Sequence, residues 1–345
     1  MYFNPEKLNK LNKALTNLKK IELGVFPTPL HEVKNISKIL DGPRILFKRE
    51  DLSGLAFGGN KTRMLEYSLA KAINNKCDCV INCSDVQSNY CRQLAAACAK
   101  LKLNLYLILR PVRGDIDIAK QGNVLLDYLA GANIEIIKEN SIEKQQKIAK
   151  GLEKELIKKG RKPYIARGIS DEDRGLDACA YVKCLIEIIS QTSNKNISFN
   201  HIFVASQDST QGGLLFASKF IELNLTIIGI NPAIDKNAFT NLCNVQEEIS
   251  RELNLEIDFN LKNGIINLID YAGEGYCISS KEGIEAVKLV AKTEGIFLDP
   301  IYSGKAMSGL IDYIKKGKLT KNDTVIFIHT GGNPALFAYV KELGL

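Results

Sequence analysis

The chain alternates short, strongly apolar runs with amphipathic, helix-like segments, and this alternation most constrains its fold. The apolar runs lie at 80–83, 105–109, 134–137, 201–205, 225–230 and 324–328. Helix-like segments follow the first two of these runs, at 89–100 and 124–129. Short runs without a polar face are typical of parallel strands that are covered by helices on both sides. The sequence therefore predicts an α/β protein built from doubly wound, open parallel sheets.

The length of 345 residues exceeds one typical hydrophobic core and indicates two domains. The clearest change of composition near the middle is the segment 159–163. No apolar run reaches the length of a membrane span, and the first residues lack the apolar core of a signal peptide. We therefore expect a cytoplasmic protein that does not bind membranes.

The 46 lysines and arginines outnumber the 39 aspartates and glutamates, which gives a net charge of +7 without any basic block. This pattern argues against nucleic-acid binding.

Nine cysteines are present, but only three histidines, and no second cysteine pair has zinc spacing. Cys77, Cys79 and Cys83 would share one side of a strand, and Cys91 and Cys98 one face of a helix. We expect buried free thiols rather than a metal site, in a reducing compartment.

The peptide Phe57-Gly58-Gly59-Asn60-Lys61-Thr62-Arg63 places one lysine after a flexible glycine pair and before a helix-like run at 64–70. Ordered backbone there can aim the amine of Lys61 into a cleft, as a lysine that forms a Schiff base requires. A solvated lysine at the start of a helix would have the same local sequence. The peptide alone leaves both interpretations open.

Polar or glycine-rich turns follow three of the apolar runs, at 84–89, 206–213 and 329–334. Free amides and hydroxyl side chains at a helix start can receive a carboxylate or a phosphate. Glycines allow the backbone to approach a flat ligand closely. Each turn could also be an ordinary helix start without a ligand. Because the carboxyl ends of parallel strands meet at one edge, the three turns and Lys61 together favour a single cofactor cleft.

Ordered matches along the chain carry a family resemblance, at 26–30, 48–51, 58–63, 87–93, 293–295, 299–307 and 329–332. They resemble the family that unites 1-aminocyclopropane-1-carboxylate (ACC) deaminase and D-cysteine desulfhydrase, pyridoxal 5'-phosphate (PLP) enzymes of the tryptophan-synthase β-chain type, fold type II. The resemblance implies PLP as cofactor, a small amino acid as substrate and a homodimer. It also implies a small domain, residues 63–165, inserted into a large domain formed by residues 1–62 and 166–345.

The resemblance also implies roles for individual residues. Lys61 would carry the cofactor and remove the α-proton of the substrate, with Ser88, Tyr276 and Tyr302 as further catalytic residues. The substrate would be bound by Gln87, Ser88 and Asn89. The cofactor would be bound by Asn60, Lys61, Asn89, Ser209, Thr210, Gly212, Ser303, Thr330 and Gly331.

Two positions favour the desulfhydrase branch. The corresponding segments of ACC deaminases look like Tyr-Glu and, later in the chain, His-Leu-Gly-Gly. This chain has Tyr302-Ser303 and His329-Thr330 at these positions. A carboxylate at the pyridine nitrogen would strengthen the electron sink, and a neutral hydroxyl need not. The resemblance thus implies a lyase that forms a 2-oxo acid, ammonia and, from D-cysteine, hydrogen sulfide by α,β-elimination. ACC deaminase, or a related lyase with another substrate, remains the alternative.

Several positions depart from the family pattern. Met64 stands where a phosphate-binding lysine is usual, Asp208 replaces a glycine of the phosphate loop, and Ser84-Asp85 replaces a small pair. Arg167 and Asp177 replace apolar or glycine positions. A non-catalytic homologue with an altered phosphate site is therefore a further alternative.

Asp208 poses an electrostatic problem for a phosphate. Two unit charges about 4 Å apart interact by roughly 4 kcal/mol at an effective dielectric of about 20. A helix terminus offsets only about 0.3–2 kcal/mol. We therefore expect Asp208 to turn away or to bond the amides of its own loop, and another cation, such as Arg63, to assist.

Overall fold

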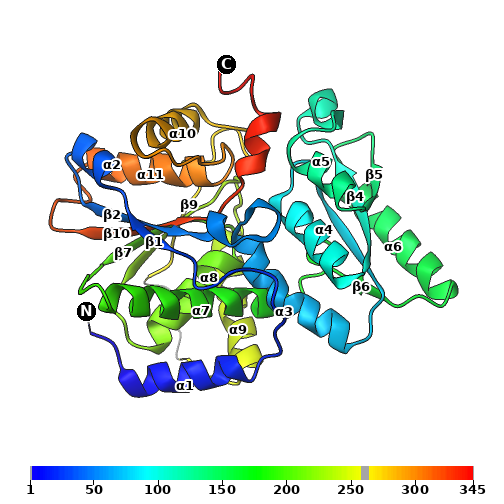
Figure 1. Cartoon of the computed structure of the whole chain (residues 1–345), viewed down its shortest axis with the longest axis horizontal. Helices are drawn as coiled ribbons and strands as arrows, with labels where there is room; N and C mark the ends of the chain where they lie inside the picture. Colours follow the sequence, from blue (N-terminus) through cyan, green and yellow to red (C-terminus); the bar gives the residue numbers. More distant parts are fainter. Residues whose placement is uncertain (1, 258–263, 345) are drawn as a thin grey trace.

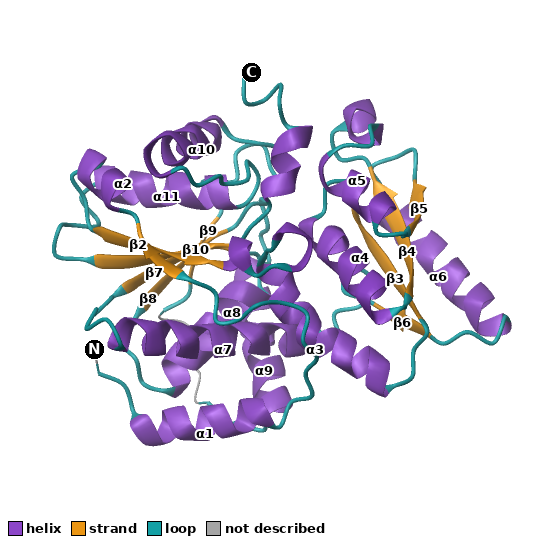
Figure 2. Ribbon diagram, in the orientation of Figure 1, coloured by secondary structure: helices purple, strands orange, loops and turns teal. Residues whose placement is uncertain are grey.

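The structure, a computed structural model that describes residues 2–257 and 264–344, contains two open sheets covered by helices (Figures 1 and 2). The six-stranded sheet has the order β1 (Leu30–Glu32), β2 (Arg44–Arg49), β10 (Thr324–His329), β7 (His201–Ala205), β8 (Thr226–Ile230), β9 (Ile266–Leu268). The four-stranded sheet has the order β5 (Asn133–Ile136), β4 (Asn104–Arg110), β3 (Cys79–Asp85), β6 (Pro163–Ile165). The predicted α/β architecture is confirmed. One difference is that the edge strand β1 pairs antiparallel with β2, so the larger sheet is mixed.

Helices cover both faces of the larger sheet, and strand β10 illustrates why its residues are apolar throughout. Val325 and Phe327 point to one face, where they pack in a core with α2 (Lys34–Ile39), α10 (Lys281–Glu294) and α11 (Ser303–Lys315). Ile326 and Ile328 point to the other, toward α1 (Pro5–Thr16), α7 (Arg174–Ser193), α8 (Ser209–Phe220) and α9 (Ala238–Leu253). All four side chains are fully buried, and each such burial stabilises the fold by about 1.5–3 kcal/mol.

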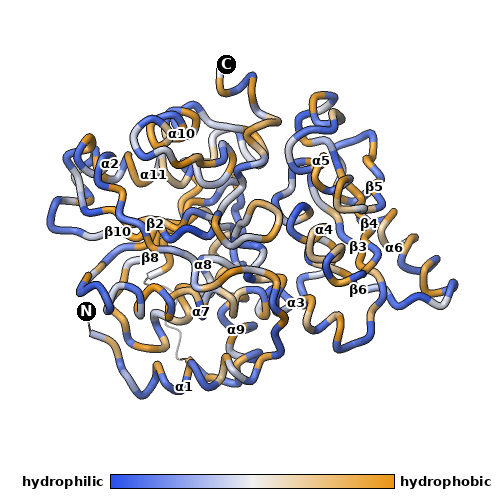
Figure 3. Tube along the Cα trace, in the orientation of Figure 1, coloured by the Kyte–Doolittle hydropathy of each residue, from blue (hydrophilic) through white to orange (hydrophobic). Residues whose placement is uncertain are grey.

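The smaller sheet packs α4 (Asn89–Leu101) and α5 (Gly122–Leu129) on one face and α6 (Ile142–Lys158) on the other. The outer helices α1 and α6 alternate between hydrophilic and hydrophobic residues along their length (Figure 3), as amphipathic surface helices do. Among the described residues, none of the helices has the length and apolar character to cross a bilayer.

The cysteines are free thiols, and seven of the nine are buried. Cys79 and Cys83 share the core beneath α6, and Cys91 and Cys98 share the core on the opposite face of the sheet, as predicted. Cys77 was expected beside Cys79, but it contacts the opposite core. The reason is that β3 begins only at Cys79, so the alternation of a strand does not extend to Cys77.

Helix α3 (Asn60–Asn74) joins the two halves of the structure. Its Leu65 and Leu69 pack in the core of the smaller sheet, whereas Met64 and Tyr67 pack in a core of the larger sheet. The short helices η1 (Glu50–Leu52) and η2 (Leu55–Phe57) lead into it, and η3 (Gly114–Ile118) and η4 (Asn333–Ala338) lie elsewhere. The predicted division of the chain at residues 63 and 165 stays a prediction.

Candidate active site

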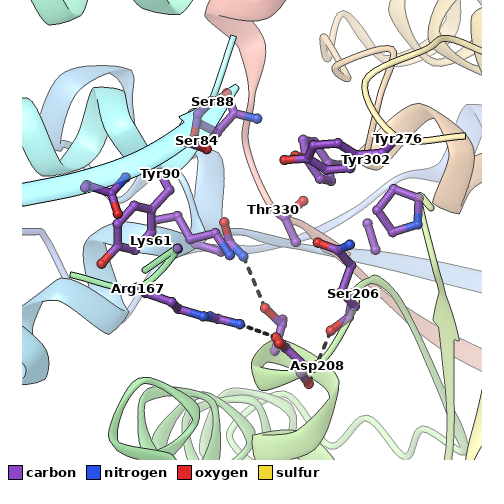
Figure 4. A pocket seen from close by; sticks show the side chains of 18 of the residues that line it. Lys61, Ser84, Ser88, Tyr90, Arg167, Ser206, Asp208, Tyr276, Tyr302 and Thr330 are labelled. Carbon is purple, nitrogen blue, oxygen red and sulfur yellow. Dashed lines mark hydrogen bonds and ion pairs between the residues drawn. The ribbon is translucent and has the colours of Figure 1, made fainter. Parts of the chain in front are cut away.

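A cavity of about 260 Å³ lies where β3, β7 and β10 end, between segments of both sheets (Figure 4). Eight of the predicted site residues line it: Asn60, Lys61, Ser88, Asn89, Thr210, Tyr276, Tyr302 and Thr330. Five do not: Gln87, Ser209, Gly212, Ser303 and Gly331. The structure therefore brings most of the proposed residues together, from positions spread over the whole chain.

Lys61 lies in the first turn of α3, directly after two glycines with positive φ, +70° at Gly58 and +133° at Gly59. A Cβ on Gly58 would stand 2.0 Å from the carbonyl oxygen of Asp51, so this turn requires glycine. The Lys61 Nζ lies 3.9 Å from the Met64 sulfur, which is a weak hydrogen-bond acceptor. Among the described residues, the amine thus lies at the cavity without a hydrogen bond to an oxygen acceptor.

The pKa of Lys61 is lowered to about 8, mainly by burial and then by the nearby Arg167 guanidinium, while the charges of Asp208 and Asp177 oppose this shift. A lysine with this pKa is neutral in a large fraction of molecules at mildly alkaline pH. A neutral amine is both a nucleophile toward a carbonyl and an acceptor for a proton. The position therefore suits covalent attachment of an aldehyde.

The turn after β3 places Ser88 and Asn89 at the start of α4. The Ser88 hydroxyl accepts a hydrogen bond from the amide of Cys91 at 3.2 Å and so caps the helix. Asn89 Oδ1 accepts from Asn123 Nδ2 at 2.8 Å. Gln87 turns away from the cavity, because its Oε1 accepts from the amide of Asn123 at 2.9 Å. Gln87 therefore fixes the turn rather than facing a ligand.

The turn after β7 leads into α8. The Thr210 hydroxyl accepts from Asn60 Nδ2 at 3.2 Å, which links this helix to the start of α3. Ser209 donates to the carbonyl oxygen of Arg174 at 3.3 Å. Gly212 faces α9, since a Cβ there would stand 2.5 Å from a methyl of Val245. Only Thr210 of these three predicted residues thus faces the cavity.

The turn after β10 contributes Thr330. Gly331 next to it packs on the loop that carries Lys61, and a Cβ there would stand 2.6 Å from the Cα of Gly59. Ser303 is fully buried at the start of α11. Its hydroxyl donates to the Asp299 carboxylate at 2.6 Å and does not line the cavity. Of the two positions that separate the family branches, Thr330 lines the cavity and Ser303 does not.

Two tyrosines and an aspartate form a row of hydrogen bonds at one wall. Tyr302 donates from its hydroxyl to that of Tyr276 at 3.0 Å, and Tyr276 donates to Asp85 Oδ2 at 2.8 Å. Burial raises the pKa of both tyrosines and of the Asp85 carboxyl. The row leaves the lone pairs of Tyr302 free to accept from the cavity side. The sequence showed Asp85 as a departure from the family pattern, but not its hydrogen bond to Tyr276.

Three other charged departures, Arg167, Asp177 and Asp208, lie near Lys61. Arg167 forms an ion pair with Asp208 (Figure 4). Its Nη1 also lies 3.8 Å from Asp177 Oδ2. Asp208 also accepts from the amide of Ser209, so the prediction that it bonds its own loop is confirmed.

The prediction for Arg63 is wrong. Its guanidinium bonds Glu50 at 2.9 Å and Glu187 at 2.7 Å, in the core below the sheet. Because Arg63 follows Lys61 by two residues of a helix, the two side chains point to different sides of it.

These residues fit an aldehyde cofactor that carries a phosphate. Lys61 offers a partner for the aldehyde, and Asn60, Asn89 and Thr330 offer polar groups around a ring. Thr210 and the start of α8 lie where a phosphate could be received. The Asp208 carboxylate stands at this last position, paired with Arg167.

Comparisons with known proteins show the family of the chain. Residues 21–331 match the family described as pyridoxal-phosphate dependent enzyme. The chain is 33% identical over 335 residues to D-cysteine desulfhydrase of Serratia proteamaculans (strain 568), covering 95% of this chain and 98% of that protein. It is 35% identical over 333 residues to a putative 1-aminocyclopropane-1-carboxylate deaminase of Pyrococcus furiosus, covering 96% and 97%.

Solved structures agree on the fold. An ACC deaminase homologue superposes with a TM-score of 0.85 at 30% identity, covering 97% of this chain and 98% of that one. Threonine deaminase isoform 2 of Solanum lycopersicum superposes with a TM-score of 0.65 at 17% identity, covering 99% and 88%. The second likeness concerns the fold alone, which is fold type II as predicted.

Proposed function

The chain belongs to the family of pyridoxal-phosphate dependent enzymes, and from this premise we propose that it is a lyase that removes the β-substituent of a small amino acid, as D-cysteine desulfhydrase does. The observation that carries the proposal is the Lys61 amine, held in the cavity with its pKa lowered to about 8. When bound, PLP supplies an electron-poor ring that stabilises negative charge at the α-carbon of a substrate.

The residues of the chain bind the substrate and transfer its α-proton. The first amides of α4, with Ser88 and Asn89, hold the substrate carboxylate at the helix start. The Lys61 amine takes the α-proton, and the β-substituent leaves with the electron pair of its bond. The aminoacrylate that is released adds water and loses ammonia to give a 2-oxo acid. D-Cysteine would thus yield pyruvate, hydrogen sulfide and ammonia.

A second candidate is the opening of ACC. It is supported by the 30% identical ACC deaminase homologue, whose fold superposes over nearly the whole chain. The PLP-loaded protein should be assayed for 2-oxo acid across D- and L-amino acids and ACC. Hydrogen sulfide and pyruvate from D-cysteine would support the lyase, and 2-oxobutyrate from ACC would favour the second candidate. Failure to release any 2-oxo acid would contradict both.

We expect covalent capture of PLP by the apoprotein to accelerate with pH and to level off above about pH 8. As pH rises through the pKa of Lys61, the amine loses its proton and becomes nucleophilic. Below that pKa the neutral fraction falls about tenfold per pH unit. Absorbance after mixing gives the rate, with N-α-acetyl-lysine, whose amine has a pKa of about 10.4, as reference. The same profile for protein and reference would contradict this expectation.

Replacing Tyr302 by phenylalanine is expected to lower kcat by about 10²-fold, because the cavity would lose a hydroxyl that can take part in proton transfer. Steady-state rates on the best substrate measure this effect. Tyr271→Phe is the matched control, since its hydroxyl donates to Asp312 at 2.6 Å and does not line the cavity. An effect on KM alone would contradict a role in proton transfer.

Other features of the family resemblance remain proposals for this chain. We propose a homodimer, which light scattering would test, and a cytoplasmic location, which the nine free thiols support. We also propose residues 63–165 as a small domain. All strands of the four-stranded sheet lie between residues 79 and 165, which supports this division.

A further inference from the structure

We infer that Arg167 holds the phosphate of the cofactor in this chain, and that Asp208 is a built-in competitor which the phosphate displaces from Arg167 and from the start of α8. This inference rests on the assignment of PLP as cofactor, and it holds whichever amino acid is the substrate. It concerns two positions that depart from the family pattern.

Asp208 stands where an anion would be received. It is the N-terminal cap of α8, and its own Oδ1 accepts from the amide of Ser209. The amide of Gln211 is bonded by the Ser206 hydroxyl at 3.0 Å, and that of Gly212 by the carbonyl oxygen of Asp208 at 2.8 Å. Among the described residues, the Thr210 amide is then the one in this first turn without a hydrogen-bond partner, so a phosphate that also uses the Ser209 amide has to take it from the Asp208 carboxylate.

Arg167 is the cation that remains for this phosphate. Of the described residues that line the cavity, the basic ones are Lys61 and Arg167, and Lys61 is needed at the aldehyde end of the cofactor. Met64, at the position of the usual lysine, is fully buried in the apolar core with α7. A guanidinium suits the role because its planar fork can donate two parallel hydrogen bonds to a phosphate.

The pairing of Arg167 makes the competition direct. Its guanidinium is bonded to Asp208 and faces Asp177 at 3.8 Å, so two carboxylates already share one cation. A phosphate beside Arg167 would add further negative charge next to both. Because like charges at such distances repel, the phosphate binds well only if the Asp208 carboxylate swings out. The cofactor is therefore held less tightly than the same cavity without Asp208 would hold it.

The affinity ratio of PLP to pyridoxal, which lacks the phosphate, isolates this contact. Absorbance and fluorescence titrations of the apoprotein at one pH would give both dissociation constants for the wild type, Arg167→Met and Asp208→Asn. We expect the preference for PLP to fall at least about tenfold in Arg167→Met and to rise at least about tenfold in Asp208→Asn, the size of change that one strong charge contact gives. Arg167→Lys, which keeps the charge but loses the fork, should lie between wild type and Arg167→Met.

Arg174→Met is the matched control. Arg174 pairs with Glu248 near the same helix start, but it does not line the cavity, so the ratio should stay within about twofold of wild type. Far-UV circular dichroism confirms that each variant is folded, and Arg167→Lys serves if Arg167→Met is not.

The two substitutions give opposite predictions, which makes the inference easy to overturn. An unchanged ratio in folded Arg167→Met or Arg167→Lys, or a lower ratio in Asp208→Asn, would overturn it. If the wild type binds PLP no better than pyridoxal, a higher preference for PLP in Asp208→Asn would support the inference. An unchanged preference in Asp208→Asn would overturn it. Because no substrate is present, failure of the proposed lyase activity would leave these results unaffected.

Discussion

Replacing Lys61 by alanine is expected to lower the rate of 2-oxo-acid release by about 10⁴-fold, the upper end of the range for loss of a general acid–base group. The variant loses both the amine that attaches to the aldehyde and the acceptor for the α-proton. The cavity contains one other basic side chain among the described residues, Arg167, and a guanidinium does not act as a base at neutral pH. Release of 2-oxo acid under saturating PLP measures the loss.

Lys71→Ala provides the control for this prediction. Lys71 lies on the same helix but pairs with Asp173 at 2.5 Å outside the cavity, so its loss should leave the rate within about twofold. Reduction of the PLP-loaded protein with borohydride should mark the wild type and Lys71→Ala permanently, and leave Lys61→Ala unmarked. Retention of the cofactor by reduced Lys61→Ala would contradict Lys61 as the covalent attachment point.

Replacing Arg63 by methionine is expected to lower the free energy of unfolding by about 3–5 kcal/mol, since it leaves a buried carboxylate without its partner. Glu50 is fully buried and accepts two hydrogen bonds from Arg63 at 2.9 Å. Burial alone would raise the pKa of Glu50, but Arg63, together with Lys48 and Thr28, outweighs burial and the pKa is lowered. The wild-type pair therefore stabilises the fold above the ordinary pKa of a glutamate, and this contribution is lost as pH falls through the lowered value.

Urea denaturation at neutral pH measures the change. Arg161→Met is the matched control, because its ion pair with Asp78 is partly exposed to solvent and is expected to contribute at most about 1 kcal/mol. The double variant Glu50→Gln with Arg63→Met should recover part of the loss, since it removes the unpaired charge. Equal effects of Arg63→Met and Arg161→Met would contradict the importance of the buried pair.

The central strands could be predicted from the sequence because both of their faces are buried. Strand β10 is apolar at every position from Val325 to Ile328, and few alternatives to a covered sheet allow that pattern. The strands β1, β6 and β9 span three residues each, which is too short for any alternation to be recognised. Their pairing depends on neighbours that are distant in sequence.

The candidate site could be predicted where a sequence motif determines the backbone conformation. It could not be predicted where the direction of a side chain depends on its tertiary contacts. The glycines before Lys61 determine the turn, so the lysine was found from the sequence. Ser303 turns to the buried carboxylate of Asp299, a contact that the motif does not encode.

Arg167 could not be assigned from sequence either. Packing of the two sheets brings it beside Lys61 and Asp208, which are 106 and 41 residues away in the chain. Neighbouring residues in sequence contain no sign of that contact.

Helix α3 gives the arrangement a mechanical consequence. Its apolar side chains are anchored in the cores of both sheets, and Lys61 lies in its first turn. Any change in the packing of one sheet against the other would therefore also shift this helix and the amine of Lys61. The position of the reactive nitrogen therefore depends on how the two sheets pack against each other, and not on the local turn alone.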